Sequence, residues 1–597
     1  KNGEQISPYI LLNHTGFKKG NRTTMNINFT LRQDFGKWIK GLTARGMFSY
    51  NNNNIHNVVR SKMPDLYKAF GRYNDGSLMT QRTVSASNIQ FAKSAASDRR
   101  YYFESQLAYE RLFNQEHRVT GLIHYYMQST ETTEANDEIS SIPKRYQALS
   151  ARATYSYKDA YLIEGNVGYT GSENFEPGKQ FGLFPAIALG WIPTQYEFMQ
   201  NHAGWLNFLK IRASYGEVGN QSGIDRYDGT QFYKFESQSG AYIGPNKGTI
   251  IDTNGKIASL GREWERIKNY NLGLDFSLFN SRLTGTAEVY MKRNDNMLIN
   301  VSYPGVLGDN AGMSNNGKFR SHGWEVMVNW SDKIGKDFTY HVGGTYSFNT
   351  NKLTDIGAVS VLKSGFVDKQ QGYPLNSIFG LRYAGKAQTE EERQKYLYRF
   401  LTGNTIGLTE QNFRLGDNMY ADVNNDGKLD QNDIVYLGTD DPKISFSFNV
   451  GAEWKGFDLS LVFQGAAQRT IFRTGDNNGN EIWRIPMKAL YLNTSNQSVG
   501  NTWSPENRGA YYPTYSNKNE INDYNYQASS WSVEDGSYIR LKNVTLGYNV
   551  PSAFLAKTKA ISSCRVYVAG ADLWEYSKIN DGWDPEASRK VSAAGRF

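Results

Sequence analysis

The stretch FTYHVGGTYSFN, residues 338–349, decides the fold class because apolar and polar side chains alternate along it. The apolar positions are Phe338, Tyr340, Val342, Tyr346 and Phe348, and the polar ones are Thr339, His341, Thr345, Ser347 and Asn349. A period of two residues is that of a β-strand, in which successive side chains point to opposite faces. We therefore expect a strand with one apolar face and one polar face.

The same alternation recurs along the chain, most clearly in residues 25–32, 283–291 and 444–454. Several copies persist for about ten residues or more, whereas strands of soluble proteins usually run for about five or six. Ten steps of about 3.3 Å, tilted near 40°, span roughly 25 Å, which is the height of the lipid-facing band of a membrane barrel. The pattern therefore favours an all-β protein, a large antiparallel transmembrane β-barrel, over a soluble sandwich, propeller or solenoid.

Composition narrows the alternatives. The 597 residues are 39% hydrophobic with a mean hydropathy of −0.60, which is too polar for a bundle of transmembrane helices. The 40 Tyr, 31 Phe and 12 Trp are too many for a disordered chain, and the single Cys564 excludes a disulfide framework. The net charge of +8 is spread without a dense basic run, so nucleic acid is not an expected partner. The chain lacks the GxSxG, HExxH and phosphate-loop motifs, so we do not expect an enzyme.

The connections between the predicted strands alternate in length. Short ones lie near residues 36–39, 114–117, 158–160, 280–281, 331–336 and 455–456. Long polar ones lie near residues 51–98, 129–145, 171–181, 218–263, 298–319, 350–441 and 466–535. Outer-membrane barrels alternate short periplasmic turns with long external loops in this way.

These segments predict sixteen strands, and a further pair is expected within residues 372–440, where Ser377–Tyr383 looks extended. The first strand, 23–34, runs toward a short turn, and the last, 562–572, runs toward a long loop. Because such barrels begin and end in the periplasm, this parity predicts strands before residue 23 and after residue 597. We therefore expect residues 1–597 to be one part of a single barrel domain.

A barrel of this size is too wide for side chains to fill, so its interior must hold water or a plug. Six polar positions are expected to face that interior, and none is assigned to a substrate: Arg282, Glu288, His341, Asn349, Asp458 and Gln464. One long loop also holds aromatic side chains that could stack on sugar rings or pack against a partner: Tyr511, Tyr512, Tyr515, Tyr524, Tyr526 and Trp531. The sequence leaves both uses of these rings open.

Residues 422–433 show the ligand spacing of a calcium-binding loop. The side-chain ligands, at positions 1, 3, 5, 9 and 12, would be Asp422, Asn424, Asp426, Asp430 and Asp433. The main-chain carbonyl of Lys428 would be the ligand at position 7. Gly427 occupies position 6, where such loops turn sharply, and Asp433 replaces the usual glutamate. A turn rich in Asp and Asn explains the same pattern without a metal. The candidate cofactor is therefore Ca²⁺ or Mg²⁺, with a role in stiffening a long loop.

Several segments, taken in order, resemble the SusC-like branch of the TonB-dependent outer-membrane transporters of Bacteroidetes. They include KDAYLIEGNVGYTGSENFEPGKQFGLFPAIALGW (158–191), LKIRASYGEVGN (209–220), ADVNNDGKLDQNDIVYLG (421–438), TWSPENRGAYYP (502–513) and GSYIRLKNVTLGYNVP (536–551). RVYVAGADLW through GWDPE, at 565–586, follows the same pattern. The resemblance covers at least residues 145–597.

This resemblance implies a barrel of 22 strands in the outer membrane, plugged by an N-terminal domain that carries a TonB-contacting segment. It also implies a SusD-like surface lipoprotein as partner, in a dimer of transporter–lipoprotein pairs. The implied activity is TonB-driven import of a glycan oligosaccharide or a peptide. The sequence shows no segment that matches the family's plug, TonB box or last strand, so we expect these in the rest of the protein. Two alternatives remain, a passive porin or adhesin barrel and a soluble β-rich glycan-binding protein.

Overall fold

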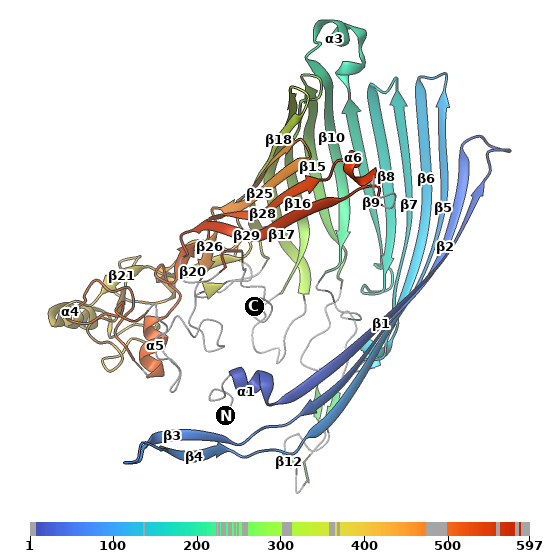
Figure 1. Ribbon diagram of the computed structural model, residues 1–597. Coiled ribbons are helices and arrows are strands. Elements are labelled where there is room, and N and C mark those ends of the chain that lie inside the picture. Colours follow the sequence, from blue (N-terminus) through green and yellow to red (C-terminus); the bar gives the residue numbers. More distant parts are fainter. Residues whose placement is uncertain are drawn as a thin grey trace.

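The computed structural model describes residues 8–134, 138–222, 261–300, 313–357, 370–472, 498–516, 518–556, 561–579 and 584–586, with short pieces between 224 and 252 and at 365–366. Its main feature is one antiparallel sheet of sixteen strands, curved into a wall, in which the strand order follows the chain (Figure 1). These strands are β1 (Gly16–Asp34), β2 (Leu42–Ser61), β5 (Gln90–Phe113), β6 (His117–Thr132), β7 (Lys144–Tyr157), β8 (Tyr161–Ser172), β9 (Phe181–Trp191), β10 (Leu206–Asn220), β15 (Glu265–Leu278), β16 (Leu283–Asn300), β17 (Met313–Ile334), β18 (Phe338–Asp355), β24 (Ile444–Trp454), β25 (Phe457–Ala467), β28 (Tyr538–Asn549) and β29 (Arg565–Ser577). The sixteen antiparallel strands that the sequence predicts are confirmed.

Shorter elements occupy the connections. The helical ones are α1 (Pro8–Asn13), α2 (Glu138–Ser141), η2 (Pro193–Gln195), α3 (Glu197–His202), α4 (Glu390–Phe400), η4 (Gln431–Asp433), α5 (Asn519–Asn525) and α6 (Ser552–Leu555). The paired short strands are β3 (Leu66–Arg72) with β4 (Leu78–Val84), β11 (Lys234–Glu236) with β14 (Ile250–Asp252), β12 (Tyr242–Ile243) with β13 (Asn246–Lys247), β21 (Tyr383–Lys386) with β22 (Asn418–Tyr420), and β26 (Thr470–Phe472) with β27 (Val533–Asp535). A three-stranded sheet combines β19 (Gly365–Phe366), β20 (Ser377–Leu381) and β23 (Ile434–Thr439). None of the helices in the described residues has the length and apolar character to cross a membrane.

The short turns lie at one end of the sheet, the short-turn end, and the long loops at the other, the long-loop end. The tightest turn joins β24 to β25 through Lys455 and Gly456, whose φ angles of 45° and 92° are left-handed, as two-residue hairpins require. The connections from β9 to β10 and from β28 to β29 are longer and carry α3 and α6 at the short-turn end (Figure 1). The predicted alternation of short and long connections is confirmed.

The strands have one apolar face and one polar face, as β9 shows. Exposure alternates along this strand, and the apolar Leu183, Ile187 and Leu189 are 49%, 47% and 51% exposed. The opposite face carries polar groups, such as Arg212 of β10, whose Nε lies 3.1 Å from a carboxylate oxygen of Asp275 in β15. We call the apolar face outward and the polar face inward. Exposing such a large apolar surface to water is unfavourable, whereas contact with lipid is favourable.

Several strands continue well beyond the apolar band. β2 and β5 are 20 and 24 residues long, and they stay paired through polar positions such as Asn53 with Asp98. The predicted loop at 51–98 is therefore too long. Only its middle part, around the β3–β4 hairpin, lies outside the main sheet. Backbone pairing does not need alternating hydrophobicity once a strand leaves the lipid, so the sequence pattern ends before the strand does.

The expected extra strand pair within 372–440 is not part of the main sheet, which is a correction to the sequence prediction. Ser377–Leu381 does form a strand, β20, but it pairs with β19 and β23. All five of its residues are buried, so it lacks the exposed apolar face of a lipid-facing strand.

Candidate functional site

Two connections at the long-loop end fold together into one body, here called the lobe, formed by residues 377–440 and 498–532 (Figure 1). Leu381 of β20 exchanges backbone hydrogen bonds with the second connection, donating to Ala528 at 2.9 Å and accepting from Ser530 at 2.9 Å. The lobe also has its own apolar core, which combines side chains from both connections: Leu381, Ala387, Tyr396, Leu397, Phe400, Leu408, Phe413, Tyr420, Leu429 and Tyr524. The two long loops thus fold as one body with a shared core.

Helix α4 contributes three of these core side chains and begins with a favourable cap. The Thr389 hydroxyl accepts a hydrogen bond from the Glu392 amide at 3.2 Å, which satisfies an amide that the helix itself cannot pair. Three glutamates occupy its first turn and Arg399 its last, both favourable orientations with the helix dipole. Tyr396, on the buried face, donates toward the Tyr420 carbonyl and accepts from the Tyr420 amide at 2.9 Å.

A buried polar network joins the two parts of the lobe. Asp417 is fully buried, and its carboxylate accepts hydrogen bonds from the Arg414 guanidinium at 3.1 Å and from the Asn525 amide at 2.8 Å. Asn525 in turn accepts a hydrogen bond from the Asn418 backbone amide at 2.7 Å. Burial raises the pKa of Asp417, although the hydrogen bonds and charge of Arg414 oppose this effect.

The aromatic side chains of the second connection mostly pack inside the lobe. Trp531 is 7% exposed and stacks on Tyr511 with ring centroids 5.0 Å apart. Tyr512 and Tyr524 are 4% and 1% exposed. Tyr515 alone among the six aromatic candidates is exposed, at 38%, while Tyr511 and Tyr526 are half-buried. The lobe interior therefore uses most of the ring faces that the sequence left open for sugars or a partner.

The candidate metal loop, residues 422–433, lies in the lobe beside α4. Asp422 accepts hydrogen bonds from the amides of Asp426 at 3.2 Å and Gly427 at 2.9 Å. Asn424 accepts from the Asp426 amide at 3.0 Å, and Asp426 accepts from the Lys428 amide at 2.9 Å. The loop thus curls around its own side-chain oxygens.

The far end of the loop is closed by two further carboxylates. Asp433 is fully buried and accepts hydrogen bonds from the amides of Val423 at 2.8 Å and Asp430 at 3.0 Å. Asp430 caps η4 by accepting from the Asn432 amide at 2.8 Å. Each of the five predicted side-chain ligands therefore has a structural role of its own.

Asp422 also has a cationic neighbour, since the Arg399 guanidinium lies 2.9 Å from its Oδ2. Burial tends to raise the pKa of Asp422, but the Gly427 amide and Arg399 together hold it below its ordinary value. Among the described residues, no group of three His, Cys, Asp or Glu side chains is arranged to hold a metal ion. The oxygen-rich donor set suits a hard cation such as Ca²⁺, and the metal site stays a prediction.

The six positions that the sequence predicts to face the interior lie on the inward face, most of them in contact with other polar side chains. On the strands, Glu288 contacts Arg212 and accepts from the Asn271 amide at 2.9 Å. Asn349 accepts from the Ser321 hydroxyl at 2.8 Å. Two others lie near the short-turn end: Arg282 pairs with Asp332, and Asp458 pairs with Arg565. His341 and Gln464 occupy the same face, opposite Gly451 and Ser447.

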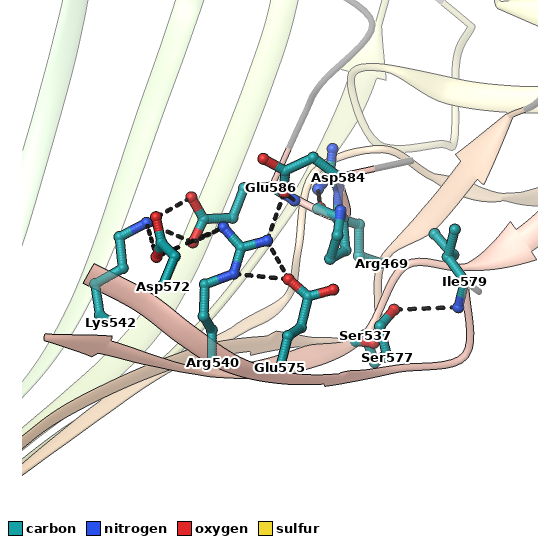
Figure 2. Close-up of polar contacts among 11 residues, drawn as sticks. Arg469, Ser537, Arg540, Lys542, Asp572, Glu575, Ser577, Ile579, Asp584 and Glu586 are labelled. Carbon is teal, nitrogen blue, oxygen red and sulfur yellow. Dashed lines mark hydrogen bonds and ion pairs between the residues drawn. The ribbon is translucent and has the colours of Figure 1, made fainter. Parts of the chain in front are cut away.

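A charged cluster on the last strands was not predicted. Arg540 of β28 is 7% exposed and lies against Glu575 of β29 and 2.7 Å from Asp584 (Figure 2). Lys542 lies 2.9 Å from Glu586. Figure 2 shows these side chains converging from β28, β29 and residues 584–586. Because the buried Arg540 guanidinium contacts carboxylates from both β29 and residues 584–586, the cluster ties residues 584–586 to the wall.

Arg469 extends this attachment to the first connection of the lobe. Its guanidinium lies 3.0 Å from the Asp440 carboxylate and donates to the Pro585 carbonyl. The charges of this cluster are visible in the sequence. Arg540 and Lys542 are two residues apart, so they lie on the same face of a strand, and Asp584 and Glu586 lie in one short motif. Nothing local, however, indicates that these two segments meet.

Three comparisons with known proteins agree with this architecture. The model of the family described as TonB dependent receptor-like, beta-barrel, matches residues 3–431. TonB-dependent receptor P26 of Formosa agariphila is 27% identical, over 94% of this chain and 57% of the relative. TonB-dependent receptor SusC of Bacteroides thetaiotaomicron is 24% identical, over 74% of this chain and 41% of the relative. The chain thus spans about half the length of the curated relatives it matches.

Solved structures show the same fold. The structure of the RagAB peptide transporter has a TM-score of 0.70 at 19% identity, covering 96% of this chain and 60% of that chain. The RagAB peptide importer in its closed-closed state has a TM-score of 0.71 at 19% identity, covering 97% and 61%.

Proposed function

The chain belongs to the TonB-dependent receptor β-barrel family, in its SusC-like branch, and from this premise we propose that the full-length protein imports a bulky nutrient across the outer membrane. The chain is an outer-membrane β-barrel protein. Import would be active, with energy delivered by TonB through a plug domain. No nucleotide site is needed for such a step.

The observation that carries this proposal is the polar inward face of a sixteen-stranded wall. Barrels of this strand number are too wide for side chains to fill, so their interior holds water or a plug. Ion pairs such as that of Arg212 with Asp275 keep this face hydrated. A polar cargo can cross beside such a face without entering the lipid.

We propose a glycan oligosaccharide or a peptide as the cargo and a SusD-like surface lipoprotein as the partner. SusC is a curated relative, and RagAB, which has the same fold, is a peptide transporter and importer. The partner would close over the long-loop end, where the lobe offers a preformed surface. The expected assembly is a dimer of transporter–lipoprotein pairs.

Co-purification tests the partner. The native full-length protein is extracted from outer membranes in mild detergent, and each chain that accompanies it is identified by mass spectrometry. We expect a SusD-like lipoprotein in equal amount. Recovery of the barrel protein alone, under conditions that keep other outer-membrane complexes intact, would contradict the pairing and favour a passive pore.

Growth and uptake assays test the activity. Cells that contain the gene are compared with a deletion strain and with a strain in which the TonB-contacting segment is removed. We expect both mutant strains to lose uptake of the same radiolabelled oligosaccharide or peptide. Uptake that survives removal of the TonB-contacting segment would refute active import, and the class of labelled compound taken up identifies the cargo.

A further inference from the structure

A groove lies in the outward face of the wall, across strands β2 and β5 to β9. Its volume is about 490 Å³, and its lining is mostly apolar. The side chains that define it are Phe48, Tyr101, Phe103, Met127 and Phe181. Pockets of about 300–1,000 Å³ are those that hold small ligands, so this hollow is large enough to bind one.

The strand register places these side chains on the outward face. Phe48 pairs with Phe103, and Phe103 pairs with Met127, so the three follow one row across β2, β5 and β6. The row begins at Phe29 of β1, which is 67% exposed. The groove is therefore open toward the membrane.

The floor of the groove is preformed. Gly171 of β8 pairs with Phe181, and a Cβ at this glycine would lie 2.4 Å from the Phe181 ring, so no larger residue fits without displacing that ring. The Phe181 ring stacks on Tyr169 at 5.0 Å. Beside them, the Tyr125 hydroxyl lies 3.2 Å from the Gln147 side chain, which satisfies polar atoms that lipid could not.

A second hollow lies on the same strands, nearer the short-turn end. It has a volume of about 530 Å³ and is lined by apolar side chains that include Leu107, Ile123 and Val167. Leu107 is four residues from Phe103 along β5, which corresponds to about 14 Å. The two hollows together form a path along which an acyl chain can lie.

Cationic side chains border the groove toward the long-loop end. Arg145 of β7 lines the groove and is exposed, and Arg99 of β5 is exposed two residues beyond Tyr101. Within the described residues no ion pair joins Arg145 to an acidic side chain, whereas Arg99 lies directly opposite Glu131 in the register of β5 with β6, and Glu173 also lines the groove. Arg145 shares a strand row with Ser129 and Tyr101, and the next outward row toward the long-loop end holds the charged Arg99 and Glu131. The apolar band thus ends at Arg145, which is the position where a side chain meets an anionic headgroup.

We propose that this groove binds a phosphate-bearing lipid of the outer leaflet, with an acyl chain along the two hollows and the phosphate at Arg145. The guanidinium offers paired donors that match phosphate oxygens. The apolar lining contacts the acyl chain. Because the groove is already formed, binding needs no rearrangement of the protein. This site is separate from the interior path for the nutrient.

Native mass spectrometry of the full-length protein tests this proposal. Delipidated protein is titrated with lipid A and, in parallel, with lipid A whose phosphate groups have been removed. We expect Arg145→Gln to weaken binding of the phosphorylated form about tenfold, through loss of a charge-assisted hydrogen bond, and to leave the dephosphorylated form unaffected. Met127→Trp, which fills the groove, should weaken both forms.

Arg320→Gln is the matched control. Arg320 is an exposed arginine on the outward face of β17, remote from the groove, and its removal should change neither affinity. Resistance of each variant to heat-induced unfolding in detergent verifies that the barrel remains folded. Equal binding of the two lipid forms, equal loss in Arg320→Gln, or a second copy of the protein covering Met127 in place of lipid would each overturn the proposal.

Discussion

Asp417 is an ionisable group placed where charge is costly. It is fully buried in the lobe, and burial holds its pKa above the ordinary value despite the hydrogen bonds from Arg414 and Asn525. Its geometry is that of a cross-link, because Asn525 belongs to the second connection of the lobe. The carboxylate therefore fastens two loops, at a free-energy cost that depends on pH.

The sign of this pH dependence follows from linkage. A carboxyl group whose pKa is raised on folding binds more protons in the folded state, so its contribution is full below the unfolded value, about 3.9, and is lost as pH rises through the folded value. We expect the melting temperature of wild type, relative to Asp417→Asn, to fall as pH rises across that window. Tryptophan fluorescence of the full-length protein, measured at a series of pH values, gives both melting temperatures.

Asp523→Asn serves as the control for this titration, since Asp523 lies exposed on α5 of the same lobe. Its melting temperature should follow that of wild type at every pH. A wild-type advantage over Asp417→Asn that grows with rising pH would show that Arg414 outweighs burial, contrary to the expectation.

Binding of Ca²⁺ at residues 422–433 depends on individual side chains. If the loop 422–433 binds Ca²⁺, the full-length protein should gain about 1.4 kcal/mol of stability at a calcium concentration ten times Kd. Asp426→Ala should abolish this gain, because it removes the side-chain oxygen at position 5 of the loop, where Asp426 is exposed. Isothermal titration with Ca²⁺, and melting temperatures with and without a chelator, measure the effect. Identical calcium responses of wild type and Asp426→Ala would show that the loop does not bind the ion.

At the scale of elements, the lobe depends on close approach between β20 and the second connection. Gly380 sits at this contact, where an added Cβ would lie 2.5 Å from the Ala528 carbonyl oxygen. We expect Gly380→Ala to destabilise the lobe by about 1–3 kcal/mol, since the two backbones must separate to admit a methyl group. Hydrogen exchange of residues 518–532 should become faster, while exchange in the wall strands stays unchanged.

Gly509→Ala is the matched substitution, because a Cβ at Gly509 has open space around it. It should leave hydrogen exchange across the lobe as in wild type. Equal acceleration in the two variants would mean that the contact between β20 and Ala528 does not hold the loops together.

The elements differ in how far the sequence predicts them. The alternation at 338–349 is local, so strand β18 and its two faces could be predicted without any knowledge of neighbours. The lobe could not, because Leu381 meets Ala528 across more than a hundred residues of chain. The same holds for the cluster around Arg540 and for the groove, whose lining comes from strands that only the register brings into one row. The spacing of 422–433 did predict a tightly curled loop, although it does not distinguish a metal from hydrogen bonds.

At the scale of the whole molecule, the wall separates two solvents. Its outward face exposes apolar side chains, its inward face holds ion pairs, and the described strands have little core between them. The lobe is different, since it has a conventional buried core and stands outside the wall. The membrane thus stabilises the wall from one side, whereas the lobe is stabilised by its own packing.

This division predicts opposite outcomes for two neighbouring substitutions. Ile187 is an outward residue of β9, 47% exposed, and Ala188 is the inward residue beside it, paired with Glu164 of β8. Ile187→Arg should cost about 2–4 kcal/mol of folding free energy in a bilayer, because the charge faces the hydrocarbon. Ala188→Arg should cost much less, since its guanidinium lies in water near Glu164. Folding of the full-length protein into lipid vesicles, followed by its heat-dependent shift in gel mobility, measures both variants. If Ala188→Arg impaired folding more than Ile187→Arg, the outward and inward faces assigned here would be reversed.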